Sequence, residues 1–298
     1  MFKRLGIQFL DLLLFSNLFI ALCAAAQALV TYHLLKLESN PYIVGFVFCS
    51  TLLIYNLSMV LSKPKHPEQS PFRRVRWIFG HYKFIVFITI LSFVCLIPLG
   101  LFYLGIKSKL LMAFLGGLSL AYNLPLIKLK NKKIGLRNLP GIKLFLIALV
   151  WSFSCVLLPI TEAESSNPNI HISWITTTLL VVKRFLFVCA ITIPFDIRDL
   201  FQDKIYELKT IPVILGEKKA WIFCQALLIL YIVLLFFFSN KFDLDTIGLS
   251  LTVILTGWLI FKSNFKRNEY YYFLFLDGTL LLQYIMLSFT SYIGSVFV

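Results

Sequence analysis

Asp196-Ile-Arg-Asp199-Leu-Phe-Gln-Asp203 and, a few residues later, Lys209-Thr-Ile-Pro-Val-Ile-Leu-Gly216 form the most informative stretch of this chain. It follows an apolar segment and holds the densest group of carboxylates in a protein with only 14 acidic residues. On a helix, offsets of three and seven residues place side chains within about 60° of one face. Oxygen ligands grouped in this way suit a hard cation such as Mg2+, which also takes phosphate oxygens. The alternative is a helix end with solvated acids at a membrane surface.

The composition is that of a multi-pass membrane protein. Hydrophobic residues make up 59% of the 298 residues and charged ones 14%, which is too apolar for a water-soluble chain of this length. We expect a single transmembrane domain over residues 1–298, because no segment between the apolar runs is long enough to fold alone. The net charge of +14 comes from basic residues in short loops. This placement favours anionic lipid or phosphate as partners and argues against nucleic acid.

The N-terminal segment has some features of a signal peptide. Residues 1–30 combine a basic start, an apolar run and three small residues at Ala24-Ala25-Ala26. However, Asp11 and Asn17 interrupt the run, and its apolar character continues to Leu35. We therefore predict a retained first span, with Asn17 as a candidate for lining a cavity.

Eight further apolar runs follow, most of them near the ~20 residues that cross a bilayer. They cover residues 42–62, 83–105, 108–126, 138–160, 173–196, 217–239, 244–262 and 269–296. With nine spans and a cytoplasmic N-terminus, 22 Lys and Arg residues fall on the cytoplasmic side and four outside, as the positive-inside rule expects. This predicts an all-α bundle of nine transmembrane helices, in a bacterial cytoplasmic membrane. Its polar loops, at about residues 63–82, 127–137, 197–216 and 263–268, would all share the cytoplasmic face.

A lysine-rich segment ends the fourth predicted span on that same face. It reads Tyr122-Asn-Leu-Pro-Leu-Ile-Lys128-Leu-Lys130. Its lysines are either topology anchors, as is common in membrane proteins, or ligands of an anionic substrate. In the second case, carboxylates and lysines on two loops would clamp a diphosphate, with the metal bridging phosphate oxygens and the lysines adding positive charge.

The combination of these features resembles the UbiA superfamily of membrane prenyltransferases. The second aspartate-rich motif of that family commonly reads D-x-x-D-x-x-x-D, followed by K-T-L-P-V-x-L-G. The residues that match it here are Asp196, Asp199, Asp203, Lys209, Thr210, Pro212 and Gly216. The nine spans and the segment 122–130 extend the resemblance over essentially the whole chain.

The first motif of the family, N-D-x-x-D-x-x-x-D at the end of span two, is degenerate in this chain. Asn56 is retained, but the aspartate positions are held by Leu57, Val60 and Pro64. The loop then becomes basic, through Lys65, His66, Arg73, Arg74 and Arg76. Such a site would not hold a second Mg2+ as the family does, unless Glu68 substitutes. Alternatively, arginines of this loop would neutralise a diphosphate directly.

The resemblance implies Mg2+-dependent transfer of a prenyl group from an isoprenoid diphosphate to an aromatic or lipidic acceptor within the membrane. It implies that Asp199 and Asp203, with Asp196, hold the metal, and that Tyr122 shields the allylic cation. The residues then implied in substrate binding are Asn56, Lys128, Lys130, Arg198 and Lys209. We expect the acidic turn and the lysine-rich turn to open on one shared cavity.

Two other functions stay open. A UbiA-like chain with a degenerate first motif would bind an isoprenoid lipid or a partner protein as a non-enzymatic subunit. A transporter would use the charged residues inside the spans, Lys183, Arg184 and Asp277, as a relay, but the sequence has no half-helix repeats that support it. Asp277 is predicted to form a buried ion pair with Lys183 or Arg184.

Overall fold

The structure is a computed structural model that describes residues 2–124, 127–129, 132–136, 141–205, 208–237 and 243–296. Its longer helices are α2 (Leu18–Leu34), α3 (Pro41–Leu61), α5 (Tyr82–Tyr103), α6 (Ile106–Asn123), α7 (Ile142–Ser152), α8 (Leu158–Ser166), α9 (Trp174–Arg198), α12 (Glu217–Phe237), α13 (Leu244–Lys262) and α14 (Gly278–Val296). Shorter elements are α1 (Phe2–Phe15), α4 (Arg73–Gly80), α10 (Leu200–Ile205), α11 (Ile211–Leu215), the 3-10 turn Pro67–Gln69 and the antiparallel hairpin of β1 (Ile127–Leu129) and β2 (Lys132–Ile134). Two π-helical segments, η3 (Phe153–Leu157) and η4 (Tyr271–Leu276), precede α8 and α14.

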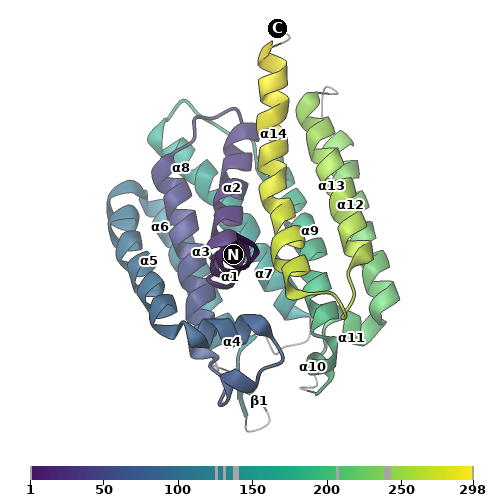
Figure 1. Ribbon diagram of the computed structural model, residues 1–298. Helices are drawn as coiled ribbons and strands as arrows, with labels where there is room; N and C mark the ends of the chain where they lie inside the picture. Colours follow the sequence, from purple (N-terminus) through teal and green to yellow (C-terminus); the bar gives the residue numbers. More distant parts are fainter. Residues whose placement is uncertain are drawn as a thin grey trace.

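The long helices form a closed ring, which Figure 1 shows from the side. Neighbouring helices around the ring are α2, α3, α5 with α6, α7 with α8, α9, α12, α13 and α14, and α14 packs back against α2. Most of the buried residues of the apolar core come from α2, α9, α12 and α13. The predicted all-α membrane bundle is therefore confirmed.

Small residues let α2 pack closely against its neighbours in this ring. Cys23, Ala24, Ala26 and Ala28 are all buried, so the backbones of α3, α14 and η3 can approach closely. Thr31 of α2 donates a hydrogen bond of 2.7 Å to the carbonyl of Cys155, which satisfies a backbone group at the irregular π turn. The alanine run that suggested a cleavage site is thus part of the packed core.

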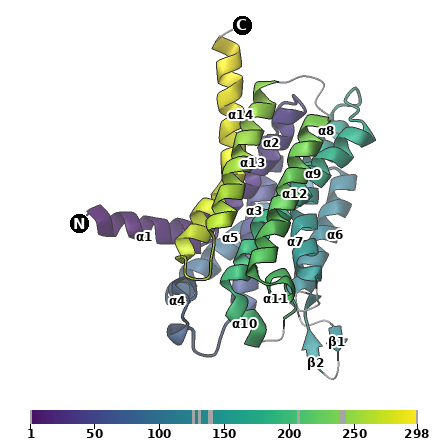
Figure 2. The same ribbon diagram turned by 90° about the vertical axis from the view of Figure 1, so that its right-hand side faces the viewer.

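The first predicted span is broken rather than continuous. α1 and α2 meet at an angle of 60°, and α1 projects sideways from the bundle in Figure 2. The break lies at Asn17, whose backbone has the left-handed conformation with φ of 67°. Asparagine tolerates this conformation better than most residues. Its side chain is held by hydrogen bonds that belong to the site described below.

Within the described residues, seven helices are long and apolar enough to cross a membrane, and the count reaches eight if the bent pair α1 and α2 forms one span. The predicted span 108–126 corresponds to α6, which is not among the seven. Two lysines in its first turn, Lys107 and Lys109, lower its mean hydropathy. The number nine thus stays a prediction.

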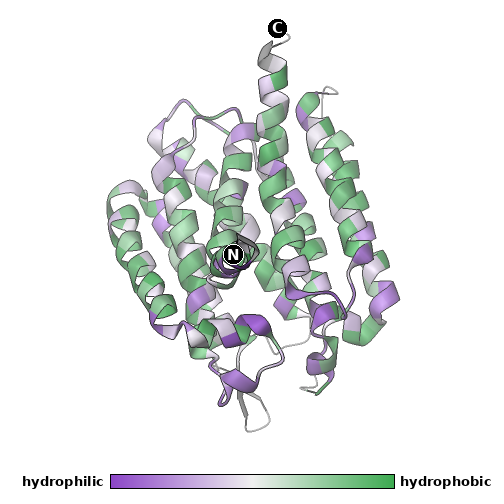
Figure 3. Cartoon of the chain, in the orientation of Figure 1, coloured by the Kyte–Doolittle hydropathy of each residue, from purple (hydrophilic) through white to green (hydrophobic). Residues whose placement is uncertain are grey.

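Polar segments gather at one end of the bundle. Figures 1 and 2 place α4, the β1–β2 hairpin, α10 and α11 together at this end, and Figure 3 shows hydrophilic residues concentrated there. These elements belong to three of the loops that the sequence assigns to one face. Any polar chemistry of the bundle is therefore to be sought at this end.

A close contact between α12 and α13 gives the first test of the packing. A Cβ added to Gly257 would lie 2.8 Å from the side-chain oxygen of Gln225, whose amide donates a 2.8 Å hydrogen bond to the Gly257 carbonyl. Gly257→Val should therefore displace the Gln225 side chain, break this hydrogen bond and cost about 0.5–1.5 kcal/mol of stability. Gly117→Val is the matched control, because nothing lies within 4 Å of the added Cβ there. Equal unfolding temperatures of the two purified variants in detergent would contradict this packing.

Candidate functional site

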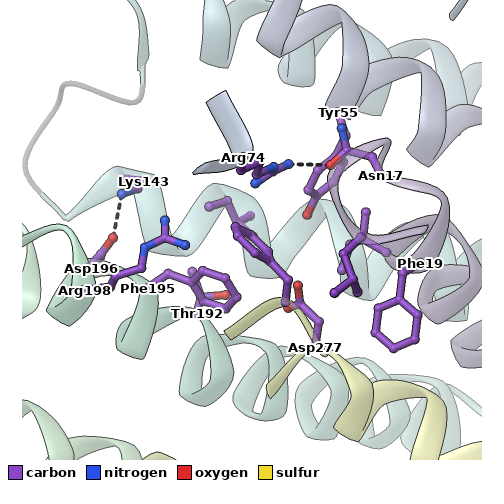
Figure 4. A pocket seen from close by; sticks show the side chains of 14 residues that line it. Asn17, Phe19, Tyr55, Arg74, Lys143, Thr192, Phe195, Asp196, Arg198 and Asp277 are labelled. Atoms are coloured by element: carbon purple, nitrogen blue, oxygen red, sulfur yellow. Dashed lines mark hydrogen bonds and ion pairs between the residues drawn. The ribbon is translucent and has the colours of Figure 1, made fainter. Parts of the chain in front are cut away.

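A cavity of about 190 Å³ lies at the junction of α1 and α2 with α3, α4, α7, α9 and η4. Its charged and amide residues are Asn17, Arg74, Lys143, Asp196, Arg198 and Asp277. Apolar and aromatic side chains, among them Tyr55, Phe195 and Phe273, form the rest of the wall. Figure 4 shows the pairs Lys143–Asp196 and Arg74–Asn17 on two sides of the cavity, with the Arg198 side chain extending between them. Basic groups and aromatic rings thus face one cavity near the polar end of the bundle.

The first pair joins the start of α7 to the end of α9. The Lys143 ammonium lies 2.5 Å from a carboxylate oxygen of Asp196, whose side chain is only 3% exposed. Lys143 also acts electrostatically on Asp203. This lysine comes directly after the lysine-rich segment in the chain, so the pair connects that segment to the acidic one.

Arg198 is held by a carboxylate and by aromatic rings. Its Nε and Nη2 donate hydrogen bonds of 2.8 and 2.9 Å to the two oxygens of Asp199. The guanidinium carbon lies 5.1–5.6 Å from the ring centres of Phe72, Phe195, Tyr272 and Phe273. A planar cation fixed on both its edge and its face loses little freedom when it binds an anion.

The sequence spacing suggested that the three aspartates share one continuous helix, but the structure breaks the acidic segment into two helices. α9 ends at Arg198, Asp199 caps it, and Asp203 lies on α10, where it accepts a 3.1 Å hydrogen bond from the Thr210 hydroxyl. Burial raises the pKa of the Asp203 carboxyl and the carboxylate of Asp196 adds to this, whereas the Lys143 ammonium opposes it. Across the described residues, no three His, Cys, Asp or Glu side chains are grouped so as to hold a metal ion by themselves.

Asn56, the retained residue of the first motif, is connected to the cavity through the side chain of Asn17. Asn17 donates a 2.7 Å hydrogen bond to the side-chain oxygen of Asn56 and accepts one of 2.5 Å from Arg74. Asn56 itself is fully buried behind Asn17. Glu68, the acid considered above as a replacement for a missing aspartate, is exposed and lies beside His66. The prediction that Asn17 lines a cavity is confirmed.

Asp277 lies in this cavity, and the predicted ion pair with Lys183 or Arg184 is not formed. The π turn η4 ends with a hydrogen bond from the Asp277 amide to the Tyr272 carbonyl, five residues back. The basic residues that act on Asp277 are Arg74 and Arg198. Arg184 instead donates a 3.3 Å hydrogen bond to the backbone carbonyl of Gln27.

The other predicted site residues are distributed around the cavity. Asp199 and Asp203 lie behind Arg198 and Lys143 and are not among its lining residues. Tyr122, in the last turn of α6, lies within electrostatic reach of Lys143 and Tyr55, but it does not line the cavity. Lys209 is exposed. The side chain of Lys128 and the whole of Lys130 lie outside the described residues.

Several lining residues were not singled out by the sequence. Lys143 is only one of the 22 basic residues counted for the topology, and Tyr55 belongs to neither motif. Arg74 was one of several basic residues in a loop with no helical pattern to rank them. A signal for Lys143 did exist, since a lysine at the start of an apolar span needs a partner or a water-filled space.

No family model matches the sequence, and no curated protein does either. Several solved structures resemble this one, among them the following three. The apo structure of a UbiA homolog from Aeropyrum pernix K1 has a TM-score of 0.63 at 13% identity, over 94% of this chain and 98% of that chain. A UbiA homolog from Archaeoglobus fulgidus gives 0.62 with GPP and Mg2+ bound and 0.59 with DMAPP and Mg2+ bound. Both of these alignments are 12% identical and cover 96% of this chain and 99% of the other. The likeness extends over nearly the full length of all these chains, and it shows that this multi-pass membrane protein has the UbiA fold.

Proposed function

We propose that the protein binds an isoprenoid diphosphate at this cavity and transfers its prenyl group to an aromatic or lipidic acceptor within the membrane. The observation that supports this most is the lining of the cavity: Arg74, Lys143 and Arg198 stand beside aromatic walls at the polar end of the bundle. Basic groups suit the diphosphate and apolar walls suit the prenyl chain. The UbiA homolog from Archaeoglobus fulgidus was solved with GPP or DMAPP and Mg2+, which agrees with this assignment.

One Mg2+ fits the acidic side of the site. Magnesium is usually bound through one or two carboxylates together with substrate phosphates and water, so a three-carboxylate cage is not required. Asp203, with Asp196 or Asp199, supplies such carboxylates, and Asp203 has only the Thr210 hydroxyl as a described side-chain hydrogen-bond partner. A bound Mg2+ would neutralise charge that develops on the departing diphosphate.

The residues of the chain provide position and charge around that step. Lys143 and Arg198 face the cavity from α7 and α9 and would hold the diphosphate at the inner rim. Tyr55 presents its ring to the same space and takes the cation-shielding role that the resemblance implied for Tyr122. Apolar walls keep water from the allylic cation until the acceptor attacks. Lys128, Lys130 and Lys209 stay candidates for additional charge at the rim.

The proposal is tested by incubating the purified protein in lipid nanodiscs with labelled GPP or DMAPP, Mg2+ and a membrane extract as acceptor source. Asp203→Asn should lower Mg2+-dependent transfer on the order of 100-fold, the typical effect of losing one preorganised electrostatic group. Glu68→Gln makes the same chemical change at an exposed acid and should leave transfer unaltered. Activity that responds neither to Mg2+ nor to Asp203→Asn would refute the site assignment.

A non-enzymatic binding role is the second candidate, because the acids of the first motif are replaced by Leu57, Val60 and Pro64. The same preparation separates the two functions. Saturable binding of labelled GPP without release of diphosphate, in the presence of every tested acceptor, would favour the binding role. For either function we place the site at the cytoplasmic face of a bacterial membrane, with the N-terminus in the cytoplasm.

A further inference from the structure

Among the cavity cations that the structure describes, Arg74 is the one whose guanidinium forms no ion pair, although its backbone N–H donates a 2.9 Å hydrogen bond to the Glu269 carboxylate. Lys143 is paired with Asp196 and Arg198 with Asp199, whereas the Arg74 guanidinium donates to the neutral amide of Asn17. Its Nε is fully buried and has no hydrogen-bond partner among the described residues. The guanidinium is also packed 4.4 Å over the ring of Phe273. A buried donor of a charged group left unsatisfied costs free energy, so the arrangement favours a ligand that accepts from it.

Arg74 lies next to the first motif, in which the aspartates of the family are absent. Asn56 is the retained residue of the first motif, and one amide, Asn17, links it to Arg74. At the aspartate positions that follow, Leu57, Val60 and Pro64 offer no carboxylate to a metal. The side of the cavity opposite the acidic segment therefore has a guanidinium where a second cation site would need acids.

Arg74 also lies close to a second guanidinium. Burial lowers the pKa of Arg74 to about 10, and the nearby charge of Arg198 contributes to this, while Asp277 opposes it. Arg74 is therefore charged at neutral pH, and two like charges face one small space. A multiply charged anion between them would relieve the repulsion, and guanidinium forks match phosphate oxygens in geometry. Asp277, which acts on both arginines, would repel the same anion.

We propose that Arg74, together with Arg198, binds the diphosphate directly and takes the place of a second Mg2+. The site then uses one metal ion on the acidic side and a guanidinium pair on the other. This inference rests on the proposed function, since it assumes that a prenyl diphosphate is the ligand. It assigns Arg74 as a substrate-binding residue.

The test measures binding of GPP and of inorganic pyrophosphate to the purified full-length protein, first in EDTA and then with Mg2+. Wild type should bind both ligands in EDTA, and Arg74→Gln should weaken this metal-free binding about 10- to 100-fold. Arg74→Lys, which keeps the charge but not the fork, should lie between them. Arg76→Gln is the matched control: it removes the same charge from the same helix, but Arg76 is exposed and donates to the Ser70 carbonyl. Asp277→Asn should shift binding in the opposite direction and tighten it.

The metal count provides a second, independent measurement. Electron paramagnetic resonance of Mn2+ added with a non-hydrolysable thiolodiphosphate analogue of GPP should give one bound ion per bound ligand. Two ions per ligand, or metal-free binding that is equal in wild type, Arg74→Gln and Arg76→Gln, would overturn the inference while leaving the proposed function intact. Failure of GPP to bind with and without Mg2+ would instead overturn the proposed function, and this inference with it.

Discussion

Replacing Lys143 with methionine is expected to destabilise the protein by about 3–5 kcal/mol, the usual cost of removing one partner from a buried ion pair. The reason is asymmetric exposure. The Asp196 side chain is 3% exposed and that of Lys143 is 26% exposed. Removing the ammonium therefore costs more free energy than removing the carboxylate, because water can solvate the lysine but not the aspartate. Without Lys143, Asp196 must either remain as an unpaired buried charge or take up a proton. Chemical unfolding of the purified variant in detergent measures the loss.

A double-mutant cycle separates this effect from simple loss of packing. Asp196→Asn alone should cost less than Lys143→Met, because the lysine can extend its ammonium toward solvent. The double variant should recover most of the stability that Lys143→Met loses, which gives a coupling energy well above the 0.5 kcal/mol or so seen for independent sites. Additive losses would show that the 2.5 Å contact between α7 and α9 does not contribute as an ion pair.

The membrane bundle could be predicted from the sequence because its signal is repeated many times. Long apolar runs separated by basic loops define helices whatever their exact packing, and the helices α3, α5, α9, α12 and α13 begin and end within a few residues of the predicted spans. The break at Asn17 was not predicted. Its cause is a tertiary one, since the hydrogen bonds with Asn56 and Arg74 come from distant parts of the chain.

The site was predictable only as far as sequence order reflects position in space. Asp196 and Arg198 were identified from the motif and do line the cavity. Arg74 and Asp277 arrive there through a loop helix and a π turn, neither of which has a distinctive sequence pattern. The helical spacing of the three aspartates was a poor guide, because α9 ends at Arg198 and places Asp199 and Asp203 on separate segments.

Replacing Tyr55 with alanine is expected to change the length of prenyl chain that the protein prefers. Tyr55 lines the charged cavity and also an apolar cavity of about 200 Å³ between α3, α5, α6 and α7. Trp151, which lines the apolar cavity too, donates a 3.3 Å hydrogen bond to the Tyr55 hydroxyl and so holds the ring between the two spaces. Under the proposed function, the prenyl chain extends away from the charged cavity, and this ring limits its reach.

Removing the ring would join the two cavities and make room for further apolar surface. Each buried methylene contributes about 0.8 kcal/mol, so one additional five-carbon unit should shift the preference by at least ~10-fold even if it is only partly buried. The measurement is the ratio of dissociation constants for GPP and for a prenyl diphosphate one unit longer, which requires no turnover. Tyr55→Phe keeps the ring and loses only the hydrogen bond with Trp151, so its ratio should match that of wild type. If Tyr55→Ala also keeps the wild-type ratio, then the prenyl chain does not pass Tyr55, and the apolar cavity belongs to the packing of the bundle rather than to the substrate path.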